Sequence, residues 1–474
     1  MTAARDVSAA EAARDVTGLR AHLAAAPEAS RLTALGLGAV LLGEGMLERV
    51  ADLVAELRDG DGDIAVLIDR RPMAAPGGDA KAIVQEALAA AGPVRPVAIG
   101  GADADVHADA DTVAAAVEAV RGSSVLVTIG SGTVSDIGKV ASARLDGLAH
   151  IVVQTAASVN GFADDQSVLV VDGVKRTTPS RWPDRLVIDT GVVALAPPAM
   201  NQAGLGDLLA TYTAPADWLL ARLVGQDASF SPAAVALARD HVDAALDAAS
   251  GIPGGAPEAI ETLAAALTLS GIAMGVAGRT APGSGMEHTV SHVLEMTDAD
   301  EGALHGAKVG VLSVFSACLW ERVRRAVAGG ALADLRFPDT EEMRGRIHAA
   351  FDAVDPTGAM AAECWRDYGR KLARWTDARP ATAGLAEQWP AFDAEVSRLL
   401  AAPERLIAAL RAAGAPTRLR DLGIDPDRSR WALEHCHLMR DRFTIADLAF
   451  LLGLWDRAGV EALVQQVTEL GCGL

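Results

Sequence analysis

Three segments in the second half of the chain place acid or imidazole side chains beside glycines, in a pattern that could bind a metal ion. Asp207 follows a Gly-Leu-Gly run, where a helix is expected to start, and His305 directly precedes a glycine. His288 and His292 are four residues apart, so on a helix both face the same side. One carboxylate and two imidazoles would leave open positions on a divalent ion, as catalysis requires. Spacing alone equally allows hydrogen-bonded structural histidines.

Most other histidines suggest no site. His435 and His437 are two residues apart, and on a helix such side chains point to different faces. Four more are isolated in the sequence and are assigned no function: His107, His150, His241 and His348.

A glycine turn between an apolar run and a helical pattern could bind phosphate. Gly130, Ser131, Gly132 and Thr133 follow the run at 124–129 and precede a helix expected at 134–144. Glycines let the backbone approach a pyrophosphate, and Thr133 and the first-turn amides offer donors at the positive end of the helix. The full GxGxxG fingerprint is absent, so a plain capped turn is the alternative. Its place at the end of a central strand favours ligand binding.

Asp69 ends an earlier apolar run at 64–68, a position where a carboxylate can bind a ribose diol. A simple strand-ending turn residue is the alternative, because Asp is common in turns. Arg70 beside it could accept a 2′-phosphate, so both NAD and NADP remain open as cofactors.

The elements that must position these residues change character along the chain. Short apolar runs at 64–68, 94–99, 124–129, 148–153 and 186–188 suit buried parallel strands, and helical stretches near 44–58, 79–91, 111–121 and 134–144 separate the earlier ones. The segment 164–178 has the pattern of a hairpin. Long helical patterns dominate after residue 195. We therefore expect a helical leader at 1–30, a dinucleotide-binding α/β domain at 31–195 and an all-helical metal- and substrate-binding domain at 196–474.

Composition restricts the class of partner. The 474 residues carry 42 Lys and Arg against 62 Asp and Glu, a formal charge of −20, which disfavours nucleic acid and anionic membranes. Four scattered cysteines favour a reduced, cytoplasmic protein. The N-terminus has no pattern of a signal peptide, and we see no apolar run long enough for a membrane span.

Six motifs follow one another along the chain: Ile129-Gly-Ser-Gly-Thr-Val-Ser-Asp-Ile-Gly-Lys139, Val153-Gln-Thr-Ala-Ala-Ser158, Val171-Asp-Gly-Val-Lys-Arg-Thr177, Ala203-Gly-Leu-Gly-Asp207, Gly285-Met-Glu-His288 and Leu304-His-Gly-Ala-Lys-Val-Gly310. Taken together and in this order, they resemble the glycerol-1-phosphate dehydrogenases, a branch of the iron-containing alcohol dehydrogenase and glycerol dehydrogenase superfamily. The similarity runs from about residue 30 to about residue 457 and includes a segment near the C-terminus, 439–448.

The resemblance implies a Rossmann-like parallel-sheet domain followed by a helical domain, the dehydroquinate synthase-like fold, with cofactor and metal in a cleft. It implies Asp207, His288 and His305 as metal ligands and His292 as a proton relay. The pyrophosphate loop would comprise Gly130, Ser131, Gly132 and Asp136, and Thr155 and Ser158 would lie beside the pyrophosphate and nicotinamide. Relatives suggest a dimer or larger homo-oligomer.

The family reaction is reversible reduction of dihydroxyacetone phosphate to sn-glycerol 1-phosphate with NAD or NADP and one divalent metal, for which zinc, nickel and iron are candidates. Such a metal polarises the ketone oxygen. Lys175 and Arg176 are candidates to neutralise a substrate phosphate, although a solvated hairpin face explains them equally well.

One residue departs from the family pattern. Asn160 stands where relatives carry Asp, and an amide neither accepts a proton nor adds negative charge beside the metal. Asp164 and Asp165 follow where relatives tend to carry small residues. Three alternatives therefore remain: a dehydrogenase of another polyol or hydroxyketone, a dehydroquinate-synthase-like cyclase, and a cofactor-binding member without turnover.

Overall fold

The computed structural model describes residues 7–101, 106–171, 174–297, 302–382 and 384–474 of the chain. Packing divides the chain into two compact units. The first consists of Met1–Leu208 and Ala233–Thr280, and the second of Leu209–Pro232 and Ala281–Leu474. The domain boundaries expected at residues 30 and 195 stay predictions, and the compact units divide the chain at other positions.

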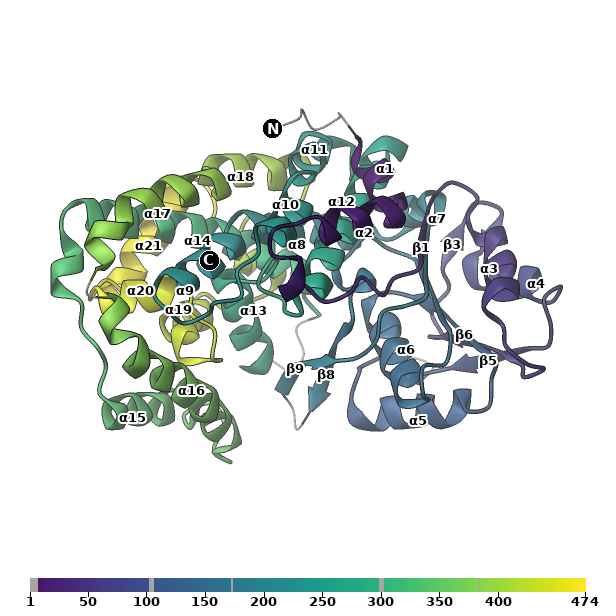
Figure 1. The fold of residues 1–474 in the computed structure, drawn as a ribbon, viewed down its shortest axis with the longest axis horizontal. Coiled ribbons are helices and arrows are strands. Elements are labelled where there is room, and N and C mark those ends of the chain that lie inside the picture. The colour runs from purple at the N-terminus through teal and green to yellow at the C-terminus, as the bar shows by residue number, and fades with distance from the viewer. Residues whose placement is uncertain (1–6, 102–105, 172–173, 298–301, 383) are drawn as a thin grey trace. The chain divides into compact units, whose positions relative to one another are not determined.

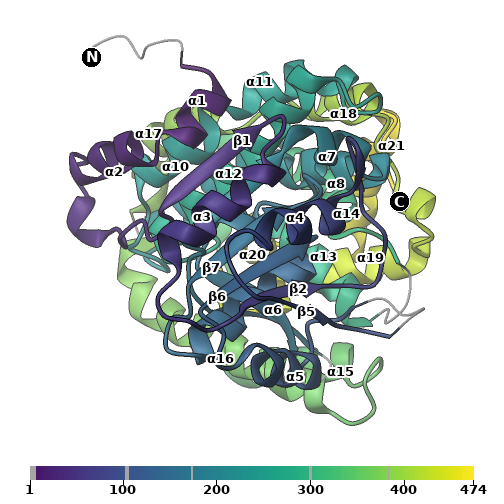
Figure 2. The same cartoon turned by 90° about the vertical axis from the view of Figure 1, so that its right-hand side faces the viewer.

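The first unit is built on a six-stranded sheet with the order β1-β10-β7-β6-β2-β5. Every neighbouring pair is parallel, and Figure 2 shows these strands crossing the unit. The strands are β1 (Ala39–Gly43), β2 (Ile64–Ile68), β5 (Val94–Ala98), β6 (Val125–Gly130), β7 (His150–Gln154) and β10 (Arg185–Asp189). The five predicted strands are confirmed to within two residues, whereas β1 was not predicted.

Helices cover both faces of this sheet (Figure 1). Ile64 and Val66 of β2 pack on one face with α3 (Val50–Leu57) and α4 (Ala80–Leu88). Their neighbours Ala65 and Leu67 pack on the other face with α5 (Ala110–Val120) and α6 (Gly132–Arg144). Because both faces are buried, the strand is apolar throughout instead of alternating, which is why these runs could be recognised in the sequence.

An antiparallel hairpin interrupts the alternation, as predicted. It consists of β8 (Gln166–Val171) and β9 (Val174–Pro179), with Leu169 opposite Arg176. Residues 172 and 173, between the two strands, lie outside the described residues. A second, two-residue pairing joins β3 (Ala74–Ala75) to β4 (Gly78–Asp79).

The first unit also contains the helical segments that precede and follow the sheet. One of them, α12, is the single helix among the described residues that is long and apolar enough to cross a membrane, but 89% of its apolar window is buried, as in a core helix. The helices are α1 (Ala9–Arg14), α2 (Val16–Ala24), α7 (Thr190–Leu195), α8 (Pro198–Leu209), α10 (Pro232–Arg239), α11 (Val242–Asp247) and α12 (Pro257–Ala277).

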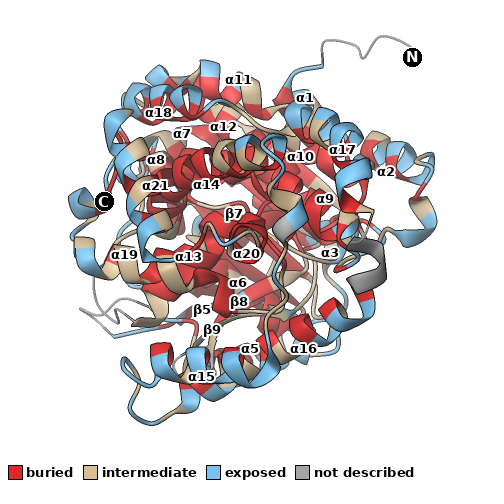
Figure 3. Cartoon of the chain, turned by 90° about the vertical axis from the view of Figure 1, so that its left-hand side faces the viewer, coloured by how far each residue is buried: buried red, intermediate tan, exposed pale blue. Residues whose placement is uncertain are grey.

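The described part of the second unit is helical. Its longest central helix, α14, is buried along most of its length, and the helices around it expose one side (Figure 3). The helices are α9 (Ala214–Leu223), α13 (Met286–Thr297), α14 (His305–Ala328), α15 (Thr340–Phe351), α16 (Ala359–Thr382), α17 (Leu385–Leu399), α18 (Pro403–Ala412), α19 (Pro426–His435), α20 (Ile445–Leu451) and α21 (Arg457–Glu469).

Candidate functional site

The predicted glycine turn lies between β6 and α6. Gly130 is the last residue of β6, and Ser131 precedes the first residue of α6, Gly132. A Cβ on Gly130 would lie 2.7 Å from the Val134 side chain. Glycine therefore lets the strand turn sharply into the helix, whose first-turn N–H groups form the positive end of the helix dipole. Thr133 belongs to this first turn.

The strand order places this turn at a position where parallel sheets commonly bind ligands. The chain passes from β2 outward to β5 and then returns to β6 on the other side of β2, so the order reverses between β2 and β6. Ligands of open parallel sheets bind at the carboxyl ends of strands where the order reverses. Asp69 follows β2 and Gly130 ends β6, so both lie at this edge. The backbone N–H of Thr155, after β7, donates to the Gly130 carbonyl at 3.2 Å.

Asp69 already forms an ion pair and a hydrogen bond within the protein. Its carboxylate pairs with Lys81 of α4, and Oδ1 accepts from the Arg71 N–H at 3.1 Å. Lys81 is 6% exposed and donates as well to the Asp69 carbonyl at 2.8 Å. Arg70 donates to the Gly100 carbonyl at 3.2 Å. A buried lysine therefore already compensates the charge expected to recognise the ribose.

Asp136 contacts the hairpin. Its Oδ2 accepts from the Val168 N–H at 3.1 Å, and its Oδ1 lies 3.1 Å from Lys139 Nζ. The Lys139 side chain is fully buried and also contacts Asp164 Oδ1 and the Gly161 carbonyl, each at 2.7 Å. Asp136 and Asp164 thus balance the charge of Lys139 and attach α6 to the hairpin. The ion pair with Lys139 therefore gives a structural explanation for an aspartate at position 164.

Asp207 lies in the last turn of α8, not at the start of a helix, so that prediction was wrong. The glycines before it are helical. A Cβ on Gly204 would collide with the Ala157 carbonyl oxygen, so glycine is required where α8 approaches the segment after β7. This close approach lets Oδ2 of Asp207, which is 1% exposed, accept from the Asn160 N–H at 3.1 Å.

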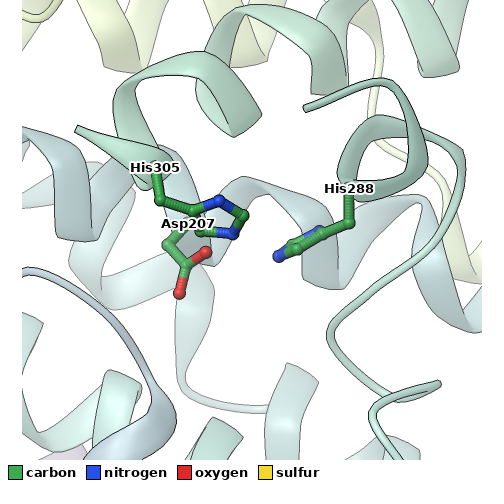
Figure 4. Close-up of side chains that lie close together, drawn as sticks. All are labelled: Asp207, His288 and His305. Carbon is green, nitrogen blue, oxygen red and sulfur yellow. The ribbon is translucent and has the colours of Figure 1, made fainter. Parts of the chain in front are cut away.

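The three predicted metal ligands converge. Asp207, His288 and His305 each offer one ligand atom, and these atoms all lie within 4.8 Å of one another. Figure 4 shows the two imidazoles and the carboxylate turned toward a common point. His288 is in the first turn of α13 and His305 is the first residue of α14. Two helix starts therefore present the imidazoles.

Two glutamates that the sequence analysis did not select contact the ligand histidines. His288 Nδ1 lies 3.1 Å from Glu287 Oε1, and His305 Nδ1 lies 2.8 Å from Glu295 Oε1. Burial raises the pKa of Glu295, but the interactions of this carboxylate with His305, His292 and Lys308 outweigh burial and hold that pKa well below its usual range. Their signal in the sequence is weak: Glu287 precedes a histidine, and Glu295 lies three residues after His292.

His292 lies beside the ligand histidines without joining the triad. Its ring centroid is 5.3 Å from that of His305 and 6.3 Å from that of His288, and its Nδ1 lies 3.6 Å from Glu295 Oε2. Burial, reinforced by the charge of Arg440, holds the pKa of His292 well below its usual range. The imidazole is therefore neutral at physiological pH.

Asn160 has separate roles for its backbone and its side chain. Its N–H holds Asp207, while its side-chain Nδ2 donates to Ser270 Oγ of α12 at 3.2 Å. A Cβ on Gly271 would collide with the Asn160 carbonyl oxygen, so α12 packs directly against this segment. Ser158 nearby is 7% exposed.

The two candidate phosphate-binding residues lie on β9. Arg176 is half-buried there and pairs in register with Leu169. The Lys175 side chain lies outside the described residues.

Comparison with known proteins agrees with this architecture. A family model described as iron-containing alcohol dehydrogenase matches residues 41–197. A Bacillus licheniformis protein named glycerol-1-phosphate dehydrogenase (NAD(P)+) is 30% identical over 344 residues, covering 72% of this chain and 71% of the relative. A Methanothrix thermoacetophila protein of the same name is 31% identical over 299 residues, covering 61% of this chain and 79% of the relative.

Solved structures show the same fold. A probable glycerol dehydrogenase from Sinorhizobium meliloti 1021 superposes with a TM-score of 0.57 at 19% identity, covering 91% of this chain and 98% of that chain. An iron-containing alcohol dehydrogenase from Thermococcus thioreducens gives a TM-score of 0.56 at 16% identity, with coverage of 91% and 98%. The chain therefore belongs to the iron-containing alcohol dehydrogenase family of NAD(P)-linked oxidoreductases, in its glycerol-1-phosphate dehydrogenase branch.

Proposed function

We propose that this protein is a metal-dependent dehydrogenase that reduces dihydroxyacetone phosphate to sn-glycerol 1-phosphate with NADH or NADPH. The observation that carries the proposal is the convergence of Asp207, His288 and His305, whose ligand atoms lie within 4.8 Å of one another. The relatives named glycerol-1-phosphate dehydrogenase (NAD(P)+) supply the substrate and cofactor class.

The donor set fits a divalent ion. One carboxylate and two imidazoles suit zinc, nickel or iron. These three residues would hold the ion, since their ligand atoms already lie within 4.8 Å of one another. When bound, such an ion polarises the substrate carbonyl and stabilises the developing alkoxide.

The glycine turn would hold the pyrophosphate of the dinucleotide. Gly130 and Gly132 allow close approach, and the first-turn amides of α6, with Thr133, offer donors at the helix N-terminus. Thr155 and Ser158 follow β7 at the same edge of the sheet, where we place the nicotinamide end. The cofactor supplies hydride, and these residues supply its placement.

His292 is the group we propose to relay a proton to the reduced oxygen. It is a neutral imidazole next to both ligand histidines, so it can take up a proton at one ring nitrogen while it releases the proton of the other. Its Nδ1 lies 3.6 Å from Glu295 Oε2. Asn160 contributes through its N–H to Asp207 and adds no charge.

The amide at position 160 supports a second candidate function, the reduction of another polyol or hydroxyketone. With an amide where relatives carry a carboxylate, a substrate hydroxyl would meet a neutral group. The competing explanation is structural, because the Asn160 side chain donates a hydrogen bond to Ser270 Oγ of α12.

A substrate panel tests the proposal. The purified protein with added zinc or nickel is mixed with NADH or NADPH and either dihydroxyacetone phosphate, dihydroxyacetone or other hydroxyketones, and oxidation is followed by absorbance. We expect the phosphorylated ketone to give the highest kcat/KM. Turnover of an unphosphorylated ketone alone would favour the second candidate. No net NAD(P)H consumption with any ketone would contradict the dehydrogenase and favour a cyclase or a non-catalytic member.

A further inference from the structure

We propose that Glu287 and Glu295 are paired positioning residues, each of which fixes one ligand histidine so that its Nε2 faces the metal. The inference rests on the proposed metal site but not on the identity of the substrate. The sequence signal of these two acids is weak, so the proposal depends on their contacts.

Glu287 is held rigidly behind His288. Its side chain is fully buried, Oε1 accepts from the Gly285 N–H at 2.5 Å, and Oε2 accepts from Thr213 Oγ1 at 2.8 Å. The same Oε1 lies 3.1 Å from His288 Nδ1. A Cβ on Gly285 would lie 3.1 Å from Glu287 Oε2, so glycine makes room for the carboxylate.

Glu295 is held in the same way behind His305. Its side chain is 4% exposed, and Oε1 lies 2.8 Å from His305 Nδ1. Lys308 Nζ lies 3.0 Å from this oxygen, and Ser291 Oγ donates to it at 3.2 Å. Because Glu295 and Ser291 belong to α13 whereas His305 and Lys308 belong to α14, this carboxylate also joins the two helices that carry the imidazoles.

These contacts determine the tautomer of each imidazole. A carboxylate beside a lysine or backbone donors is an acceptor only, so the neighbouring Nδ1 must carry the proton and donate it. In a neutral imidazole the lone pair then resides on Nε2, the atom left to bind a cation. A carboxylate behind a ligand histidine both orients the ring and makes it more basic, and loss of such a partner commonly weakens metal affinity about 10–100-fold.

The two glutamates differ in one respect that the test can use. Glu287 contacts His288, whereas Glu295 contacts His305 and also lies 3.6 Å from His292 through its second oxygen. Replacing Glu287 should therefore disturb one histidine, and replacing Glu295 should disturb two.

The experiment uses the full-length protein with selectively ¹⁵N-labelled histidine. Two-bond ¹H–¹⁵N NMR spectra of the metal-free protein report which ring nitrogen is protonated, and competition with a chromophoric chelator gives the zinc affinity. We expect Nδ1–H tautomers for His288 and His305 in the wild type. Glu287→Ala and Glu295→Ala, which remove the acceptor beside Nδ1, should each populate the Nε2–H tautomer of their own histidine and weaken zinc binding by about tenfold or more.

Asp447→Ala is the matched control, because Asp447 is also a buried carboxylate in an ion pair, 2.6 Å from Lys371 Nζ, but it contacts Lys371 and Thr444 instead of an imidazole. It should lower Tm without changing the tautomers or the zinc affinity. If Glu295→Ala does not fold, Glu295→Asp, which withdraws the carboxylate by one methylene, provides the same test.

The outcomes separate this inference from the proposed function. Unchanged tautomers, a loss of affinity below about tenfold, or an equal loss in the control would overturn the positioning roles while leaving the metal site intact. A wild-type protein that binds no zinc, nickel or iron would overturn both. Absence of ketone reduction in a protein that binds metal would contradict the proposed function only, because neither readout uses substrate.

Discussion

Three aspartates of the first unit carry their charge beside a buried lysine. Asp69 pairs with Lys81, whereas Asp136 and Asp164 pair with Lys139. A buried ion pair contributes little net stability, but loss of one partner leaves an uncompensated charge that commonly costs about 3–5 kcal/mol. These lysines therefore constrain the segments around the glycine turn. The first role of the three aspartates is to form these ion pairs, and not to bind a ligand.

His150 shows the same influence of surroundings on a residue outside the site. It is fully buried, contacts Thr128 Oγ1 at 3.0 Å, and burial, with the charges of Arg181 and Lys139, lowers its pKa to about 3. In the unfolded chain this group has a pKa near 6.5, so it is protonated below that pH, whereas in the folded chain it stays neutral until the pH approaches 3. The stabilising contribution is therefore present above about pH 6.5 and is lost as pH falls toward 3.

Replacing His150 tests this dependence. Between about pH 7 and pH 5 the wild type should lose about 2 kcal/mol of unfolding free energy through this residue. His150→Gln should remove that part of the loss, and His348→Gln, which changes an exposed histidine of α15, should not. Urea unfolding at both pH values measures the difference. An identical pH dependence in His150→Gln and the wild type would contradict the assignment.

At the level of single residues, the sequence predicted the types and the order of the site residues but not their partners. Asp207, His288 and His305 stood out because glycines and histidine spacing surround them. Glu287 and Glu295 did not, because an acid near a histidine is ordinary on a helix. Likewise, the partners of Asp69 and Asp136 come from other elements, and only the fold brings them together.

Among the elements, α8 depends most on a single small residue. Gly204 lies inside the helix where it approaches the Ala157 carbonyl, three residues before Asp207. Gly204→Ala should force the helix outward, cost about 1–3 kcal/mol and weaken metal binding by displacing Asp207. Thermal unfolding and metal titration measure the two effects.

Gly345→Ala is the matched control for this substitution. Gly345 is an exposed residue of α15, and no described atom lies within 4 Å of a Cβ built there. The change should stabilise the protein by about 0.5–1 kcal/mol through helix propensity and leave metal binding unchanged. If Gly204→Ala were as harmless as Gly345→Ala, the close approach of α8 would be refuted.

The elements themselves were predicted unevenly, for physical reasons. Strands β2, β6 and β7 are buried on both faces, so each appears as a continuous apolar run. The edge strand β1 was missed because its short apolar run lies among glycines at 36, 38, 43 and 45. The end of α8 was taken for a start because glycine was interpreted as a helix boundary, whereas packing requires it inside the helix.

For the whole molecule, the net charge of −20 repels an anionic cofactor and a phosphorylated substrate. Several lysines are buried in ion pairs, including Lys81, Lys139 and Lys371. Dinucleotide and substrate phosphates must therefore rely on local donors, such as the first turn of α6, instead of a favourable overall field.

The central claim is that Asp207, His288 and His305 together bind one divalent ion. The most direct test is the metal content of metal-free protein after equilibration with zinc, nickel or iron and removal of excess ion, for the wild type and for Asp207→Ala, His288→Ala, His305→Ala and the control His348→Ala. We expect about one ion per chain in the wild type and the control, and almost none in the three triad variants. Full occupancy in any triad variant would contradict the assignment of that residue, and full occupancy in all three would contradict the metal centre.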